Sequence, residues 1–179
     1  MGKIMRFVKA TKDDLSRLSE FYKYVIDNTE DMSVYCRWIY GLHPSDDMIL
    51  EYIEQGCMYY AVEDDGLKII AAFAVTFNQG EDYHAIKWNI EASDDEVAVI
   101  HILCTNPDLQ GHGYAKSVVE DIINMARLKN LKAVRLDALD TNIPAHKLYE
   151  SMGFDKRGVQ NWYACNLGWA DFWLYEYVI

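Results

Sequence analysis

Residues 97–127 read VAVIHILCTNPDLQGHGYAKSVVEDIINMAR. Val97–Cys104 is apolar apart from His101, a pattern typical of a strand that is covered on both faces. A glycine-rich turn follows, and from Gly113 to Lys129 the apolar residues recur at helical spacing. Backbone N–H groups at the start of a helix lack intrahelical partners and carry a partial positive charge. The stretch therefore predicts a strand, a phosphate-binding loop and a helix in succession.

The rest of the chain predicts a mixed sheet with helices on its faces. Apolar residues alternate or run continuously in some segments and recur at helical spacing in others, with turn residues between them. We find no internal repeat or linker, so residues 1–179 are expected to form one α/β domain. The expected strands are residues 4–10, 58–63, 67–77, 97–104, 132–139, 154–165 and 171–178, with a further strand near 86–90. The expected helices are residues 12–28, 32–40, 46–55, 113–129 and 143–152.

Composition narrows the class of partner. The chain has 17 Lys and Arg against 28 Asp and Glu, a net charge of −11, which argues against nucleic-acid binding. The charge favours cationic partners, although it also serves solubility. No apolar run approaches a membrane span, and the first residues lack a signal peptide. The four scattered cysteines show no metal-site spacing, so we expect reduced thiols, no metal and a cytoplasmic protein.

Three phosphate-binding motifs can be compared with the glycine turn. A Walker A loop requires glycine where Gln110 and Ala115 stand. A dinucleotide-binding fingerprint requires a third glycine where Lys116 stands, and it belongs near the first strand of a domain. Both of these motifs fail on their residues.

The third motif fits. Gln110–Ala115 (QGHGYA) resembles the Gln/Arg-x-x-Gly-x-Gly/Ala pyrophosphate loop of the GNAT acetyltransferase superfamily. A second segment, Asn142–Phe154 (NIPAHKLYESMGF), is similar to the family's second cofactor segment in its Asn, Ala, Tyr and Gly-Phe. The two segments lie about thirty residues apart with an apolar strand between them, which makes the resemblance specific.

The resemblance implies a GNAT fold, with a mostly antiparallel mixed sheet that splays between its fourth and fifth strands. Residues 97–154 would form the cofactor-binding core, residues 1–96 would include a wall of the acceptor site, and residues 155–179 would form a closing hairpin. Acetyl-CoA would be the cosubstrate, its pantetheine arm lying along the fourth strand like an added strand. The cofactor contacts implied in this way are Leu103, Cys104, Thr105, Gln110, Gly111, His112, Gly113, Tyr114, Ala115, Lys116, Asn142, Ala145 and Tyr149.

The family reaction is direct acetyl transfer to an amine, which needs a proton acceptor for the amine and a proton donor for the thiolate. Tyr149 occupies the family position whose phenol faces the CoA sulfur, so the resemblance implies that it is the general acid. His101 is the first candidate for the base, because it is expected to share a strand face with Leu103 and Thr105. Glu96, at the mouth of the same strand, is the alternative.

The acceptor is expected to be a primary amine of a small molecule or a peptide. Asp94, Asp95 and Glu96, with Trp88 and Tyr83 near them in sequence, could receive a cationic or aromatic amine. The aromatic residues of the closing segment could form another wall or the face of a homodimer; these are Trp162, Tyr163, Trp169 and Trp173. The alternative to an enzyme is an acyl-CoA sensor or binding module that has the same fold but no turnover.

Overall fold

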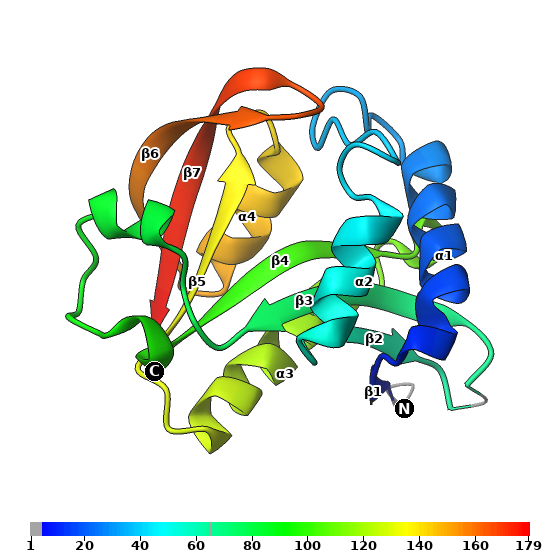
Figure 1. Cartoon of the computed structure of the whole chain (residues 1–179), viewed down its shortest axis with the longest axis horizontal. Coiled ribbons are helices and arrows are strands. Elements are labelled where there is room, and N and C mark those ends of the chain that lie inside the picture. The colour runs from blue at the N-terminus through cyan, green and yellow to red at the C-terminus, as the bar shows by residue number, and fades with distance from the viewer. Residues whose placement is uncertain (1–4, 65) are drawn as a thin grey trace.

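The computed structural model describes residues 5–64 and 66–179. Its seven-stranded sheet has the order β1-β2-β3-β4-β5-β7-β6 (Figure 1). Among the described strands, β4 and β5 pair in parallel and the other neighbours pair antiparallel, which confirms the predicted mixed, mostly antiparallel sheet. The strands are β1 (Arg6–Lys9), β2 (Met58–Val62), β3 (Ile69–Thr76), β4 (Val97–Thr105), β5 (Ala133–Leu139), β6 (Asp155–Ala164) and β7 (Gly168–Val178). The expected start of the first strand, residue 4, lies outside the described residues.

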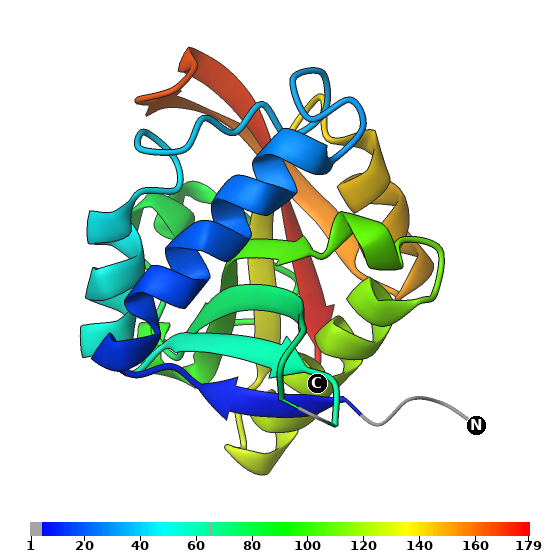
Figure 2. The same ribbon diagram turned by 90° about the vertical axis from the view of Figure 1, so that its right-hand side faces the viewer.

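Helices cover both faces of the sheet. The longer helices are α1 (Leu15–Asn28), α2 (Asp46–Glu54), α3 (Tyr114–Leu128) and α4 (Ile143–Ser151). The α1 and α2 helices pack on one face, and α3 and α4 lie on the other (Figure 2). A capping box between Thr11 and Asp14 precedes α1. Within the described parts of the chain, no helix has both the length and the apolar character needed to cross a bilayer.

The strands β4 and β5 separate along their length. Only Val97–Ile100 of β4 pair with β5, where their partners are Ala133–Leu136. Beyond Ile100 the two strands diverge, and β5 rises past β4 in Figure 1. The splay predicted from the family resemblance is therefore present, and it leaves the β5-facing edge of the last residues of β4 without a paired strand.

A β-bulge lies in β4 where the strands diverge. Against β3, His101 pairs with Ala74 and Cys104 pairs with Ala72. Ile102 and Leu103 therefore stand opposite one residue of β3, and Ile102 has a φ of 44°. The extra residue bends the strand and shifts its alternation.

The bulge corrects one expectation about His101. Alternation predicted that His101 shares a face with Leu103 and Thr105, and this is wrong. With the bulge, His101 lies on the same face as Cys104, toward α1 and α2. Leu103 packs instead with the cluster on the α3 side.

The helix expected at residues 32–40 is absent, and a loop spans residues 29–45. Asp31 and Arg37 have left-handed backbone conformations, with φ values of 55° and 58°. The carbonyl of Tyr35 accepts a hydrogen bond from Thr141 Oγ1 at 2.9 Å, and that of Arg37 accepts one from Asn166 Nδ2 at 2.9 Å. The left-handed residues interrupt a helical backbone, and Thr141 binds the Tyr35 carbonyl that a helix over 32–40 would have used. The helix prediction was therefore wrong.

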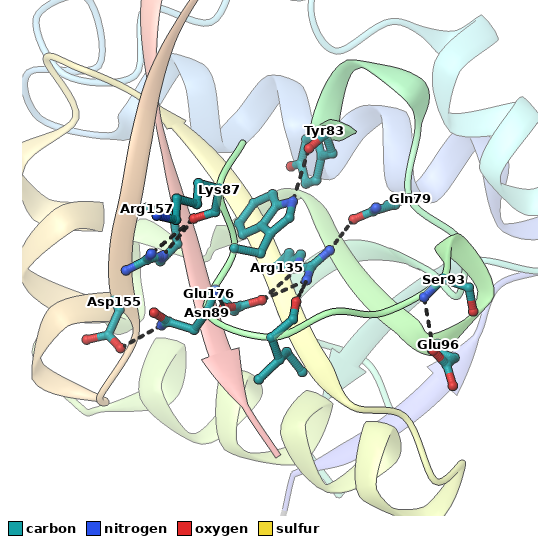
Figure 3. Close-up of polar contacts among 12 residues, drawn as sticks. Gln79, Tyr83, Lys87, Asn89, Ser93, Glu96, Arg135, Asp155, Arg157 and Glu176 are labelled. Atoms are coloured by element: carbon teal, nitrogen blue, oxygen red, sulfur yellow. Dashed lines mark hydrogen bonds and ion pairs between the residues drawn. The ribbon is translucent and has the colours of Figure 1, made fainter. Parts of the chain in front are cut away.

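The strand expected near residues 86–90 is also absent, because side chains bind the backbone there. The N–H of Asn89 donates to Glu176 Oε1 at 2.7 Å, and the carbonyl of Ile90 accepts from Arg135 Nη2 at 3.3 Å. Arg135 and Glu176 lie on β5 and β7, and they hold residues 78–95 against the sheet (Figure 3). We refer to residues 78–95 as the covering segment.

Candidate active site

The glycine loop, residues 110–116, presents backbone N–H groups without acceptors. Gly111 and Gly113 have left-handed φ values of 79° and 78°, and a β-carbon at either would meet nothing within 4 Å. Among the described residues, no acceptor binds the backbone N–H groups from Gly111 to Lys116. The next amide, that of Ser117, donates to the Gly113 carbonyl at 3.1 Å. The loop is therefore an open group of donors at the start of α3, suited to an anion.

A cavity adjoins this loop, and we call it the loop cavity. Its other walls come from the 29–45 loop and from α4, and Thr105 and Lys116 also line it. Thr29 lines it as well, and its Oγ1 is buried without a hydrogen-bond partner among the described residues. A buried hydroxyl without a partner is costly, and a ligand in this cavity could satisfy it.

A second cavity, which we call the inner cavity, occupies the space where β4 and β5 diverge. Its volume is about 190 Å³. Cys36 and Asn142 line both cavities, so the two share a wall. His101 and Tyr149 both line the inner cavity. The structure thus brings together the predicted acid and the first candidate for the base.

Tyr149 lies on α4 and is 7% exposed. Its ring packs edge-on against Phe154, with the ring centroids 5.5 Å apart. No hydrogen bond among the described residues involves its hydroxyl, and burial raises the pKa of Tyr149 above its usual value. The phenol is therefore protonated at neutral pH and free to donate a proton or a hydrogen bond into the cavity.

His101 lies between two elements. Its Nε2 is 2.9 Å from Thr76 Oγ1 on β3, and its ring stacks on Tyr52 of α2 at 5.5 Å. Burial, with a smaller effect of His43, lowers the pKa of His101 to about 4. The imidazole is therefore uncharged at neutral pH and keeps one unprotonated ring nitrogen.

Glu96 lies away from both cavities, at the opposite end of β4 from the bulge. Its carboxylate is 2.7 Å from Lys132 Nζ and accepts a hydrogen bond from the Ser93 N–H at 2.9 Å. These two contacts, the Lys132 bond first, lower the pKa of Glu96 to about 2. Glu96 caps a short 3₁₀ turn, and the structure does not bring it to the predicted acid.

The acidic and aromatic residues near Glu96 line neither of the two cavities. Asp94 accepts hydrogen bonds from Gln79 and His84, and Trp88 lies under the Arg135 guanidinium. None of the predicted aromatic residues of the closing segment lines either of the two cavities; Tyr163 and Trp169 are exposed near the β6–β7 turn. The homodimer remains a prediction.

Most of the predicted cofactor contacts line one of the two cavities. Cys104 does not, because the bulge turns its side chain toward α1 and α2, so only its backbone could meet a ligand. His112 does not either, because its ring folds back onto the loop: Nδ1 lies 3.1 Å from the Leu109 carbonyl and 3.0 Å from that of Gln110. Asn142 caps α4 through its side-chain oxygen and lies between the cavities. The residues that do line a cavity are Leu103, Thr105, Gln110, Gly111, Gly113, Tyr114, Ala115, Lys116, Asn142, Ala145 and Tyr149.

Asp137 of β5 lines the inner cavity and was missed from the sequence. It receives a hydrogen bond from the Tyr83 hydroxyl at 2.7 Å, and burial raises its pKa. A signal for it was available, because the strand AVRLDAL carries two charged residues in an otherwise apolar run. Trp38, His43 and Tyr52 also line the cavity, and their loop and helix positions gave no such signal. In the part of the chain that the structure describes, no group of His, Cys, Asp or Glu residues is arranged to hold a metal ion.

Comparison with known proteins places this geometry in a family. The curated N-acetylaspartate synthetase of Danio rerio is 35% identical over 65 residues, which is 36% of this chain and 23% of the relative. The [ribosomal protein bS18]-alanine N-acetyltransferase of Haemophilus ducreyi is 32% identical over 89 residues, which is 44% of this chain and 61% of the relative. The matches thus span less than two thirds of either relative.

Solved structures agree in fold. A GNAT-family acetyltransferase from Streptococcus agalactiae superposes with a TM-score of 0.73 at 16% identity, covering 98% of this chain and 95% of that one. The ribosomal-protein-S18-alanine N-acetyltransferase of Escherichia coli gives 0.67 at 15% identity, covering 98% and 94%. The model of the acetyltransferase (GNAT) family matches residues 13–154, which include β4, the glycine loop and α4. The chain therefore belongs to the acetyltransferase (GNAT) family.

Proposed function

We propose that this protein transfers the acetyl group of acetyl-CoA directly to a primary amine of a small molecule or peptide, with Tyr149 as general acid and His101 as proton acceptor. One observation carries the proposal. The cavity that holds Tyr149 and His101 shares the wall formed by Cys36 and Asn142 with the cavity of the glycine loop. A donor held at the loop and an acceptor in the inner cavity would therefore meet there.

The residues present fit acetyl-CoA, which supplies an acetyl thioester and a thiolate leaving group. The unpaired N–H groups from Gly111 to Lys116 suit a pyrophosphate, and Lys116 adds a positive charge. The edge of β4 beyond Ile100, where β5 has diverged, suits an amide-bearing arm. The orphaned hydroxyl of Thr29 offers a further hydrogen bond.

The protons balance in the following way. His101 takes a proton from the ammonium form of the acceptor, directly or through water, and the free amine forms a C–N bond to the acetyl carbon. The C–S bond breaks, and Tyr149 donates its proton to the departing thiolate. The amide nitrogen loses its second proton, which restores Tyr149, and His101 releases its proton to solvent. The products are an amide, a thiol and one proton.

Thiol release measured against a panel of amines and peptides tests the proposal. Tyr149→Phe is expected to lower kcat by about 10²-fold or more, the usual contribution of a general acid, with an unchanged Kd for CoA by calorimetry. Tyr163→Phe, at an exposed site near the β6–β7 turn, is the control and should behave as the parent protein.

Two results would contradict the proposal. Full activity of Tyr149→Phe would remove the tyrosine from the reaction. CoA binding without turnover on any amine would favour the sensor or binding module instead.

A further inference from the structure

We propose that Asp137 binds the ammonium group of the acceptor, and that the acceptor is a small primary amine that carries no carboxylate or phosphate. This inference rests on the acetyl transfer proposed above and names its substrate class. It depends on the position of Asp137, the contact that holds its carboxylate, the charge of the inner cavity and the size of that cavity.

Strand register places Asp137 and His101 at the point where β4 and β5 part. In the parallel pairing, Val99 lies next to Arg135 and Ile100 next to Leu136. The next residues along the two strands are His101 and Asp137, and they lie on the same face of the sheet where the strands part. Both side chains line the inner cavity together with Tyr149. An amine bound to this carboxylate would thus lie near the proposed acid and base.

Among the described residues, one side chain holds the carboxylate of Asp137, through one of its oxygens. The Tyr83 hydroxyl donates to Asp137 Oδ2 at 2.7 Å, and Tyr83 itself is 3% exposed. Its ring lies 5.6 Å from that of Trp88 and 6.1 Å from that of Trp162, so its position is fixed by packing. A carboxylate accepts several hydrogen bonds, so acceptor capacity remains for a ligand. Burial raises the pKa of Asp137, and a bound ammonium ion would counter this effect.

The charge of the inner cavity favours cations. Among the described residues that line it, none is Lys or Arg, and Asp137 is the carboxylate. Burial lowers the pKa of both His43 and His101, so neither adds a positive charge at neutral pH. An acceptor bearing a carboxylate would bring a second negative charge into the cavity without a partner, which is costly.

The size and walls of the cavity describe the rest of the acceptor. Its volume of about 190 Å³ lies below the range of roughly 300–1,000 Å³ that encloses drug-sized ligands. Trp38, Tyr52 and Phe172 contribute aromatic surface to it. Such walls suit an alkyl or aromatic group, and their faces also attract a cation.

The test compares acceptors of different charge on the wild type and on Asp137→Asn. The probes are 2-phenylethylamine, which is cationic at the assay pH, aniline, which is uncharged, and aspartate, which is anionic. The wild type should acetylate 2-phenylethylamine with a kcat/KM at least about tenfold above that for aspartate. Asp137→Asn should raise KM for 2-phenylethylamine at least about tenfold, as expected when a hydrogen bond to a charged group is lost. KM for aniline should change less than about twofold.

Asp82→Asn is the matched control. It removes the same charge from the covering segment, close enough to raise the pKa of Asp137, but Asp82 does not line the cavity. Its KM for 2-phenylethylamine should stay within about twofold of the wild type, because the lost charge lies outside the cavity and does not contact the amine. Equal losses for 2-phenylethylamine and aniline in Asp137→Asn, or a wild-type preference for aspartate, would overturn the inference.

Folding and turnover are checked separately. CoA binding measured by calorimetry reports whether Asp137→Asn is folded. If that variant is not folded, Tyr83→Phe takes its place in the test, because it keeps the carboxylate of Asp137 and removes the hydrogen bond to Oδ2. If the wild type acetylates no amine, the proposed function fails. The binding of 2-phenylethylamine to the CoA-loaded wild type and variants by calorimetry then tests Asp137 on its own, and binding unaffected by the variants would refute its role.

Discussion

The ion pair between Arg135 and Glu176 fixes the covering segment, and breaking it on one side is expected to destabilise the whole fold. Both residues are 1% exposed. Arg135 Nη2 and Nε lie 2.8 and 2.9 Å from Glu176 Oε2, and Nη1 donates to Gln79 Oε1 at 2.6 Å (Figure 3). The guanidinium also lies 4.1 Å from the centre of the Trp88 ring. The pair thus joins β5 and β7 to Gln79, near the start of the covering segment, and to Ile90, nearer its end.

The magnitude follows from what each substitution leaves behind. Glu176→Leu leaves a buried guanidinium without a counter-charge and the Asn89 N–H without its acceptor. Breaking a buried pair on one side costs about 3–5 kcal/mol. Taking about 4 kcal/mol, and about 3 °C of Tm per kcal/mol for a chain of this size, gives a fall of roughly 12 °C.

The double variant Arg135→Met/Glu176→Leu removes both charges, so its cost should lie below the sum of the single costs. We expect the difference to be about 0.5–3 kcal/mol, the usual coupling of contacting residues. An exposed pair, Lys12 with Glu54 at 2.6 Å, supplies the control. Glu54→Gln should cost less than about 1 kcal/mol.

Urea unfolding followed by circular dichroism measures the free energies of unfolding of these variants. The same variants, assayed for acetyl transfer, should show a raised acceptor KM and a nearly unchanged Kd for CoA, because Tyr83 of the covering segment holds Asp137. A cost below about 1 kcal/mol for Glu176→Leu, or strict additivity in the double variant, would refute the argument that the pair is a coupled, buried unit.

Three further predictions concern the two cavities. Thr29→Val removes a buried hydroxyl that has no partner among the described residues. The free energy of unfolding should stay the same or rise, and the Kd for CoA, measured by calorimetry, should rise about 2–10-fold. An unchanged Kd would exclude a hydrogen bond between the Thr29 hydroxyl and CoA. The pKa of His101 is about 4 in the folded protein and about 6.5 in the unfolded chain. Between these pH values the unfolded chain binds a proton at His101 that the folded protein does not bind. Lowering the pH from 7 to 4 should therefore reduce the free energy of unfolding by about 3 kcal/mol through His101. Urea unfolding at both pH values should show His101→Gln losing that much less, and equal losses would contradict the burial. Gly113→Ala places a β-carbon in open space at a left-handed φ of 78°, so its urea unfolding should show a cost of only about 1–2 kcal/mol; a larger loss would mean that the space is not open.

The cofactor half of the fold was predictable because its signals are local. The strand before the glycine loop, the helix after it and α4 each carry their own periodicity and punctuation within about fifteen residues. The conformations of the 29–45 loop and of the covering segment were not predictable, because their backbone groups bind partners far along the chain. Tyr35 and Thr141, for example, are 106 positions apart. A helical pattern in sequence cannot reveal that such a partner will take its carbonyls.

The residues of the inner cavity show a second limit. A bulge leaves no mark in a continuous apolar run, so alternation assigned His101 to the wrong face of β4. Arg135 and Asp137 lie two positions apart on β5, and both are charged residues in an otherwise apolar strand. One is buried in an ion pair and the other lines a cavity, because β4 leaves β5 between them. That distinction depends on tertiary structure and not on residue type.

The 29–45 loop has a consequence for how specificity could change over evolution. Side chains outside the loop, those of Thr141 and Asn166, tie down its carbonyls. Its own Cys36, Trp38 and His43 face the inner cavity. Substitutions at these three positions could therefore reshape the proposed acceptor pocket while the loop keeps its path and the sheet keeps its register. A scaffold of this kind lets new substrate preferences arise by drift and selection at a few positions, without changes to the glycine loop proposed to hold the acetyl donor.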